Sequence, residues 1–484
     1  MAVNATPGFD LIPSAERVTL QSNYITNFDF LNQYLPDTYE KEFERYGNRS
    51  ISSFLRMVGA EMPTNSDMIK WAEQGRLHIK YTNVNADSAA GTDAGATFTV
   101  NDVLNPTIPG GTTTAGNGGI AIRIGQTIMI SDNTAGSNLS NKAVVTGVNY
   151  TTGVVTVSFY EAAGQAMAVN TTVTMWIYGS EFKKGTEGMV ETLESDDFIF
   201  DNKPIIIKDK YAVSGSDMAQ IGWIEITSED GANGYLWYLK SEHDTRLRFE
   251  DYMETALVEA VPAESGSGAA IHFGNAAGTD AQGGSEGVFH VVAQRGNVYG
   301  GGNPTTLADF DSIIQRLDKQ GAIEENVIFM NRQFTFDMDD MLAAQNSYGA
   351  GGTSYGLFDN DEEMALNLGF TGFRRGYDFY KSDWKYLNDP TMRGGLVGGG
   401  INGLLVPAGS TTVYDQILGK NAKRPFLHVR YRASETEDRR YKTWITGSAG
   451  GARTSSLDAM EVHFLTERTV CTLGANNFFL FQNA

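Results

Sequence analysis

The stretch from residue 82 to residue 180 differs abruptly in composition from the sequence on either side of it. Seven charged residues fall within it: Asp87, Asp93, Asp102, Arg123, Asp132, Lys142 and Glu161. Thr, Gly, Ala, Val and Asn dominate instead. Short β-branched runs separated by glycine and asparagine favour strands joined by turns. The stretch therefore predicts a small all-β insertion domain.

Alternating side chains predict individual strands within this insert. The sequence "IAIRIGQTIMI" has five isoleucines of one parity, which is typical of a half-buried strand: Ile120, Ile122, Ile124, Ile128 and Ile130. "AVVTGVNYTTGVVTVSFYE" predicts a hairpin whose turn lies at residues 151–153. "VTMWI" predicts a further strand. After the insert, residues 179–226 offer strand-like runs but no core of their own. A ribbon there must lie on another surface, such as a second copy of the chain.

The clearest helix signals lie outside the insert. In "PTTLADFDSIIQRLDKQG", Thr306 and Asp309 have the spacing of a capping box and Gly321 marks the end of the helix. "NVIFMN" predicts a strand and "RQFTFDMDDMLAAQN" a second helix. "PTNSDMIKWAEQG", residues 63–75, also predicts a helix, because Thr64 has the same capping spacing to an acidic residue. Short strands alternate with loops toward the C-terminus. Together these elements predict an α+β body.

Composition limits the classes of protein to which the chain can belong. Its 484 residues, of which 41% are hydrophobic, are enough for two or three domains with real cores. The formal charge is −21, from 58 acidic and 37 basic residues. A protein that grips nucleic acid along its surface needs the opposite balance, because its cations must neutralise phosphates. A protein that encloses DNA without gripping it stays compatible with this charge.

The cellular compartment follows from three further features. Cys471 is the one cysteine, which excludes an intrachain disulfide, and its surroundings "ERTVCTLG" predict a buried strand. The first residues, "MAVNATPGFD", lack the basic and apolar regions of a signal peptide. No apolar run is long enough to cross a membrane. We therefore expect synthesis in a reducing cytoplasm.

The segment from Tyr235 to Ala260 predicts a long helix with a tight group of acidic residues and a histidine: Glu242, His243, Asp244, Glu250, Asp251 and Glu254. Oppositely charged pairs at i,i+4, such as Glu242 with Arg246, support an exposed helix by a few tenths of a kcal/mol each. A site would need these charges to converge. The narrow apolar stripe contains Leu236, Leu239, His243, Leu247 and Leu257. The helix would be about 39 Å long. We interpret it as a mechanical strut.

No other pattern predicts a chemical site. Gly398, Gly400 and Gly403 match G-x-G-x-x-G, but a β-like run follows them where a dinucleotide site needs a helix, which favours a flexible loop. The acidic run 359–363 lacks the glycine and distal glutamate of an EF-hand. Six histidines show no metal-ligand spacing: His78, His243, His272, His290, His428 and His463. We expect no catalytic, cofactor-binding or metal-binding residues.

Residues 420–453 form a locally basic stretch in this acidic chain. It contains three acidic residues, Glu435, Glu437 and Asp438, and nine basic ones: Lys420, Lys423, Arg424, Arg430, Arg432, Arg439, Arg440, Lys442 and Arg453. The stretch could contact DNA. Acidic surfaces of neighbouring subunits are the favoured partners, because a chain of this charge offers many of them.

Several strings together resemble the major capsid proteins of tailed double-stranded DNA bacteriophages, which have the Hong Kong 97-like (HK97-like) fold. They are "GSEFKKGTEG", "YAVSGSDMAQIGWIE", the helix at 235–260, "TLADFDSIIQRLDKQG" through "NVIFMNRQFTFDMDDMLA", "GLLVPAGSTTVYD", "PFLHVRYR" and "TWITGSAGGARTSSLDAMEVHFLTE". The resemblance covers most of the chain outside the insert, and crass-like phages are a candidate source.

The resemblance implies an α+β fold in five parts. These are an N-terminal arm at 1–60, an extended loop (E-loop) with peripheral-domain strands at 61–81 and 181–234, the β-rich insertion domain at 82–180, the spine helix and the rest of the peripheral domain at 235–302, and an axial domain at 303–484 whose C-terminal strands return to the body. Some members cross-link lysine to asparagine. Lys183 and Lys184 lie in the ribbon region, but nothing marks a partner asparagine, and we expect no cross-link.

The function implied by the resemblance is self-assembly, not catalysis. Pentamers and hexamers of the chain would form an icosahedral head shell around double-stranded DNA, without sequence-specific binding and without a membrane. Portal, scaffold, auxiliary or decoration proteins would be partners, and a separate scaffold protein would guide assembly in the host bacterial cytoplasm. One alternative is a phage tail or baseplate protein that binds a glycan through the β insert. A polysaccharide-degrading enzyme is the other.

Overall fold

The computed structural model divides into two compact units, each built from segments that are distant in the sequence. Among the described residues, the first unit holds 206–256 and 435–467, and the second holds the remainder. The predicted N-terminal arm lies outside the described residues. The described residues are 61–76, 78–87, 95–101, 120–134, 140–150, 152–161, 171–189, 197–219, 226–227, 233–234, 237–273, 283–321, 323–346, 372–396, 398, 400–415, 420–451 and 453–483.

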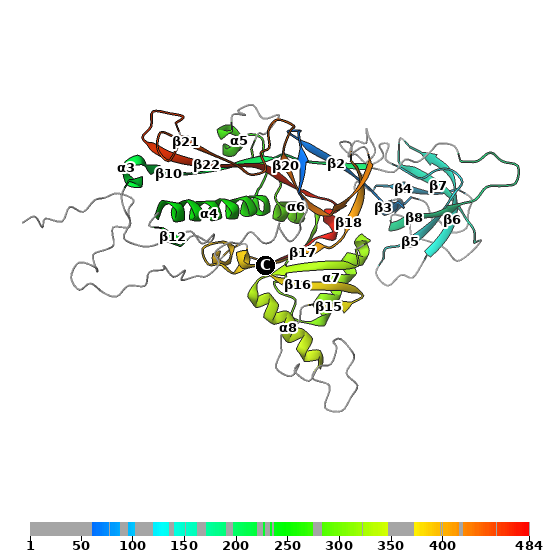
Figure 1. Ribbon diagram of the computed structural model, residues 1–484. Coiled ribbons are helices and arrows are strands. Elements are labelled where there is room, and N and C mark those ends of the chain that lie inside the picture. Colours follow the sequence, from blue (N-terminus) through cyan, green and yellow to red (C-terminus); the bar gives the residue numbers. More distant parts are fainter. Residues whose placement is uncertain are drawn as a thin grey trace, which may run out of the picture. The chain divides into compact units, whose positions relative to one another are not determined.

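In the first unit a long helix runs beside long strands (Figure 1). The helix is α4 (Trp237–Glu259), and the strands are β10 (Ile205–Ser214), β21 (Lys442–Gly447) and the part of β22 (Ala459–Thr472) that ends at Glu467. β22 lies between β10 and β21. Three short elements complete the unit: α3 (Gly215–Met218) and the paired strands β11 (Ile226–Thr227) and β12 (Asn233–Gly234). The helix predicted at 235–260 is confirmed.

Phe249 is the residue of α4 that anchors the helix to this sheet. Its side chain is 0% exposed, and its ring centroid lies 5.7 Å from that of Phe464 and 5.6 Å from that of Tyr441. Met253 lies one turn further along the same face, and Val462 of β22 completes the contact.

Of the apolar stripe predicted from leucines and His243, Leu257 is buried at 1% exposure, whereas His243 and Leu247 are half-buried. The side chains of Leu236 and Leu239 lie outside the described residues. The prediction left out Phe249, whose ring makes the aromatic contacts to the sheet.

The second unit contains a six-stranded mixed sheet in the order β13–β23–β17–β14–β16–β15. Its strands are β13 (Asn297–Tyr299), β14 (Glu325–Met330), β15 (Gly372–Arg375), β16 (Tyr377–Asp383), β17 (Ile401–Pro407) and β23 (Phe479–Gln482). Helices α7 (Leu307–Gln320) and α8 (Arg332–Asn346) pack their apolar stripes, including Phe310 and Phe334, into one core with Leu405 and Phe481. The helices predicted at 304–321 and 332–346 and the strand predicted at 326–331 are confirmed.

The predicted ends of α7 are confirmed in detail. The Thr306 hydroxyl accepts a hydrogen bond from the Asp309 amide at 3.2 Å, and the Asp309 carboxylate accepts one from the Thr306 amide at 3.3 Å. Gly321 follows the helix with a φ of 81°, a left-handed conformation that favours glycine.

The glycine motif at 398–403 is only in part the loop that the sequence predicted, because Gly398 and Gly400 lie in coil but Gly403 does not. Gly403 lies inside β17, every residue of which is buried. A Cβ atom at Gly403 would come within 2.9 Å of the Phe329 carbonyl oxygen and 3.0 Å of the Phe334 ring. The glycine is therefore needed for close packing in the sheet, and no helix follows it.

Several shorter strands and helices also belong to the second unit. β1 (Glu61–Thr64) pairs in parallel with β20 (Leu427–Arg432), which pairs with the end of β22, where Cys471 is buried as predicted. β18 (Ser410–Asp415) and β19 (Lys420–Pro425) form a hairpin. The short helices are α5 (Gly268–His272), α6 (Val288–Arg295), α9 (Lys385–Asn388), η2 (Arg393–Gly395) and η3 (Ala475–Asn477).

Six strands from the low-charge stretch close into a barrel in the order β3–β4–β7–β6–β5–β8. They are β3 (Lys80–Ala86), β4 (Ala96–Val100), β5 (Gln126–Asp132), β6 (Ser140–Asn149), β7 (Val154–Phe159) and β8 (Thr172–Ser180). The hairpin predicted at 151–153 is confirmed, with Gly153 at a φ of 77°. The barrel interior is filled with aliphatic and aromatic side chains such as Phe98 and Ile130.

The isoleucine pattern at 120–130 did not give one continuous strand. Ile120 and Ile122 enter the barrel core, but a turn at Ile124 and Gly125 leaves Ile124 52% exposed, and β5 begins only at Gln126. Gly125 has a φ of 88°, which makes a turn there, and Ile128 and Ile130 beyond the turn enter the same core.

The helix predicted at 63–75 is wrong, because these residues form β1 and β2 (Ile69–Gln74). The Ser66 hydroxyl donates to the Met68 carbonyl at 2.8 Å, which makes a turn where the sequence predicted a helix start. β2 then pairs along its whole length with β9 (Asp197–Asn202). Pairing with a distant strand outweighed a capping signal of about 1 kcal/mol.

Replacing Phe249 with alanine should test the packing of the first unit. We expect Phe249→Ala to lower the free energy of unfolding by about 3–5 kcal/mol, because it leaves a cavity beside Phe464. Tyr252→Ala, on the exposed side of the same helix, should change it by less than about 0.5 kcal/mol. Hydrogen exchange of the α4 amides in the unassembled chain measures both. Equal exchange in the two variants would contradict the assigned packing face.

Candidate functional site

The two-stranded ribbon β2–β9 belongs to the second unit and joins segments on either side of the barrel in the sequence. The two strands pair antiparallel from Ile69 opposite Asn202 to Gln74 opposite Asp197, and they form a sheet of their own. Between them the chain runs through the whole barrel, from β3 to β8, and returns along residues 181–189. The barrel is therefore inserted between the two strands of the ribbon.

The inner face of the ribbon is held by one arginine. The Arg295 guanidinium lies 4.3 Å from the Phe200 ring centroid and 6.0 Å from that of Trp71. The same guanidinium forms an ion pair with Glu286 at 2.8 Å. A cation over an aromatic face and a carboxylate at its edge fix the guanidinium plane, so this face of the ribbon is packed and oriented.

Asn202 fastens the base of the ribbon. Its side chain is 4% exposed, and its amide donates to the carbonyl oxygens of Glu286 at 2.9 Å and Val470 at 2.7 Å. Its amide oxygen accepts from the Ser285 hydroxyl and the Glu286 amide, both at 2.9 Å. One buried side chain thus joins three segments that are distant in the sequence. Sequence reasoning missed it, although the alternation in "DFIF" before it is a usable strand signal.

The outer face of the ribbon is open. Lys70, Ala72 and Gln74 of β2 lie on this face with Ile199 and Asp201 of β9, as the alternation of exposure shows. Ile199, which stands opposite Ala72 on this face, is 70% exposed. In the part of the chain that the structure describes, neither strand has a second neighbour, so both backbone edges are available for pairing.

The coil that leads back from the barrel is exposed along its described length, 181–189. Lys183 and Lys184 both belong to it and are exposed. The Lys183 carbonyl accepts a hydrogen bond from the Thr186 hydroxyl at 2.7 Å, which gives the coil a local turn.

The charged group on α4 is dispersed, as the sequence analysis expected, but two of its members are buried. Asp251 is 8% exposed and Glu254 is 4% exposed. Arg248 reaches across to Asp209 of β10 at 3.8 Å, and Arg246 contacts the His243 ring at 3.1 Å. No group of three potential metal ligands occurs among the described residues. The strut remains our interpretation of this helix.

Some of the basic residues at 420–453 form ion pairs with acidic residues of the same chain. Arg432 pairs with Asp67, Arg439 pairs with Glu467 at 2.6 Å, and Lys442 pairs with Glu437. The side chains of the first three basic residues of the stretch, and the acidic run 359–363, lie outside the described residues.

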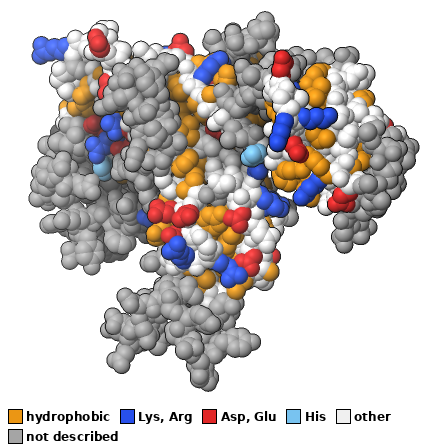
Figure 2. Space-filling view, turned by 90° about the vertical axis from the view of Figure 1, so that its right-hand side faces the viewer, with side chains coloured by type: hydrophobic (Ala, Val, Ile, Leu, Met, Phe, Trp, Pro, Cys, Tyr) orange, Lys and Arg blue, Asp and Glu red, His pale blue; other side chains and the backbone are white. Residues whose placement is uncertain are grey.

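Figure 2 shows one face of the molecule, on which the described lysines and arginines are scattered among acidic and hydrophobic side chains. They do not gather there into a continuous cationic surface of the kind that grips nucleic acid. Among the described helices, none is both long and apolar enough to cross a membrane.

No protein-family model and no curated protein matches the sequence. Solved structures that resemble the chain include one from Microbacterium phage Oxtober96, with 9% identity, a TM-score of 0.39, and coverage of 94% of this chain and 98% of that one. The capsid of a native GTA particle matches with 8% identity and a TM-score of 0.37, over 96% and 99%. The mature capsid of bacteriophage PhiM1 matches with 8% identity and a TM-score of 0.32, over 63% and 78%. Because these TM-scores are below 0.5, the similarity does not by itself establish a shared fold.

Removing the Asn202 side chain should loosen the ribbon. We expect Asn202→Ala to cost at least about 3 kcal/mol, because it leaves buried backbone and hydroxyl groups without partners. Asn83→Ala, which removes one exposed hydrogen bond of 3.3 Å in the barrel, should cost less than about 1 kcal/mol. Denaturant unfolding of the unassembled chain, with hydrogen exchange in β9, compares the two. A loss at residue 202 no greater than at residue 83 would contradict the anchoring role.

Proposed function

We propose that the chain is a major capsid protein of a tailed double-stranded DNA phage, with the HK97-like fold. The observation that carries the proposal is the ribbon β2–β9. It is fastened at its base by Asn202, packed on one face by Arg295, and left with an apolar outer residue and two open strand edges. A two-stranded ribbon built in this way is completed by another surface, and a second copy of the chain supplies one.

The parts of the chain have distinct roles in this proposal. The segments 61–81 and 181–234 serve as the E-loop and peripheral-domain strands, and α4 within 235–302 serves as the spine helix. Residues 303–484, with the six-stranded sheet, serve as the axial domain, and the barrel within 82–180 is an insertion domain. The arm at 1–60 would add further contacts to neighbouring subunits.

Repetition of one heterologous contact explains how such a subunit makes a shell. A ribbon that pairs with a different surface on the next copy generates a ring when the rotation closes, and rings of five and six can close into an icosahedral particle. The charge of −21 suits a wall that confines DNA without adhering to it. The subunit would act in the virion, after assembly in the host cytoplasm, with scaffold, portal and decoration proteins as partners and without catalysis.

The tail or baseplate alternative is not favoured. Fibre proteins build length from repeated β units, whereas the described strands of residues 80–180 close into a single barrel.

The state of assembly of the purified full chain tests the proposal. Light scattering and electron microscopy at normal and lowered salt, with and without a co-expressed scaffold protein, should show rings or closed particles. Persistence of a monomer or trimer in all four conditions would overturn the proposal.

The ribbon's part in assembly is tested by a matched pair of substitutions. Ile199→Asp puts a charge on the open face of the ribbon and should abolish rings and particles while leaving the melting temperature of the subunit unchanged. Ile124→Asp changes an isoleucine of similar exposure in the barrel and should assemble as the native chain does. Assembly of both variants to the same extent would show that the ribbon face is not the contact.

A further inference from the structure

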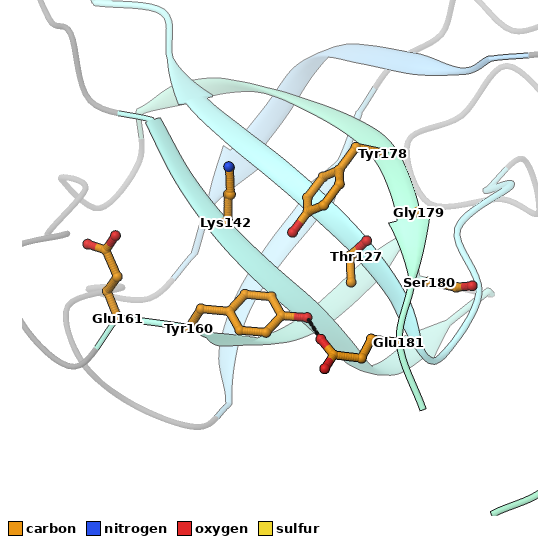
Figure 3. A pocket seen from close by; sticks show the side chains of 8 residues that line it. All are labelled: Thr127, Lys142, Tyr160, Glu161, Tyr178, Gly179, Ser180 and Glu181. Atoms are coloured by element: carbon orange, nitrogen blue, oxygen red, sulfur yellow. Dashed lines mark hydrogen bonds between the residues drawn. The ribbon is translucent and has the colours of Figure 1, made fainter. Parts of the chain in front are cut away.

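The outer wall of the barrel holds a pocket that neither the fold nor assembly explains (Figure 3). Its volume is about 500 Å³, within the range of roughly 300–1,000 Å³ typical of small-molecule sites. Eight residues from β5, β6, β8 and the segments that follow β7 and β8 line it: Thr127, Lys142, Tyr160, Glu161, Tyr178, Gly179, Ser180 and Glu181.

A β-bulge creates one wall of this pocket. Thr127 of β5 stands opposite Gly179 of β8, whereas the next residue, Ile128, stands opposite Ile177. Tyr178 is therefore the extra residue of β8, and its ring projects from the barrel beside the pocket. The Lys142 ammonium lies 5.8 Å from the centroid of that ring and helps to hold it in place. Bulges often redirect side chains at functional positions.

The floor of the pocket includes the hydroxyl group of Thr127. Thr127 occupies an outward-facing position of β5, yet its side chain is only 4% exposed. Its Oγ1 atom is buried and has no hydrogen-bond partner among the described residues. A buried hydroxyl in this state costs stability, and a ligand that bonded to it would recover that cost.

Gly179 lies directly beside this hydroxyl. A Cβ atom built on Gly179 would lie 3.2 Å from Thr127 Oγ1, closer than side chains normally approach. Its backbone is not in the left-handed region, so its conformation alone does not require glycine. A side chain at this position would therefore crowd the hydroxyl.

The opposite wall is a tyrosine locked to a carboxylate. The Tyr160 hydroxyl donates to Glu181 Oε2 at 2.5 Å. Burial, followed by this hydrogen bond, raises the pKa of Tyr160 to about 12, so the phenol keeps its proton at neutral pH. Both tyrosine rings stay accessible, with Tyr160 49% and Tyr178 42% exposed.

The chemistry of the lining selects among ligands. One lysine and two glutamates give it a net charge of −1, which disfavours phosphates and other anions. The hydroxyl on the floor and the carboxylates on the walls disfavour a purely apolar ligand. A pyranose ring meets both conditions, because its C–H faces pack on aromatic rings and its hydroxyl groups both donate and accept hydrogen bonds.

We infer that this pocket is a binding site for a neutral saccharide, with Tyr160 and Tyr178 as the aromatic walls and the Thr127 hydroxyl as the partner for one sugar hydroxyl. The affinity of one site should be low, since the pocket is shallow and few polar groups converge in it. If the chain forms a shell as proposed above, many copies would bind a glycan-coated surface together, and their combined affinity would exceed that of one site by about 10²–10⁴. The single-site binding does not depend on the shell.

The test uses the unassembled full chain and a panel of neutral sugars: the methyl glycosides of glucose, galactose and mannose, and N-acetylglucosamine. Ligand-observed NMR titration at millimolar concentrations should show saturable binding of at least one of them. Thr127→Val should weaken that binding about 5-fold, which is the loss expected for one hydrogen bond. Tyr178→Ala should weaken it more than about 10-fold, through the lost ring face.

Two further measurements separate binding from stability. Thr127→Val should leave the melting temperature unchanged or raise it, because it removes an unpartnered hydroxyl, whereas a structural role for this hydroxyl would lower it. Gly179→Ala should weaken sugar binding by filling the floor. Thr146→Val, on the exposed outer face of β6, is the matched control and should bind as the native chain does. Lack of binding by every sugar in the panel, or equal binding by the native chain, Thr127→Val and Tyr178→Ala, would overturn the inference.

Discussion

The hydrogen bonds of Asn202 determine where the ribbon starts and which way it faces. This buried side chain satisfies backbone groups of residue 286 and residue 470 while it accepts from the Ser285 hydroxyl, which also contacts Thr469 at 2.8 Å. Because a buried polar network is stable only when every member has a partner, small displacements of the ribbon base are costly. The orientation of the ribbon follows from this network together with the Arg295 contact.

A ribbon fixed in this way has one covered face and one open face. An isolated subunit gains nothing from Ile199 at 70% exposure or from strand edges that no other described strand pairs with, and such edges promote association. Their retention makes sense in a protein whose working form is an assembly. The helix–sheet unit around Phe249 differs from the ribbon, because the apolar face of its helix is buried within the same chain. This unit can therefore act as a rigid support.

The barrel, unlike the ribbon, pairs all of its strands within one closed sheet. Closure of six strands removes sheet edges, so a domain placed between the ribbon strands does not compete with the ribbon for pairing. Its outer wall is consequently free to carry a site. The bulge at Tyr178 and the Thr127 hydroxyl, which has no hydrogen-bond partner among the described residues, line the same pocket.

The sequence by itself determined the elements whose signals are local. The α7 helix, with its capping box and its terminal Gly321, the hairpin at 151–153 and the long charged helix were all predictable, because each depends on residues within a few positions of one another. The low charge of residues 82–180 similarly predicted strands. Only the tertiary structure decided the fate of residues 63–75, where pairing with β9 replaced a predicted helix. The same holds for Gly403, for Asn202 and for the Thr127 pocket, since each depends on partners that lie far away along the chain or on an irregularity in strand pairing, and neither leaves a spacing that a single sequence reveals.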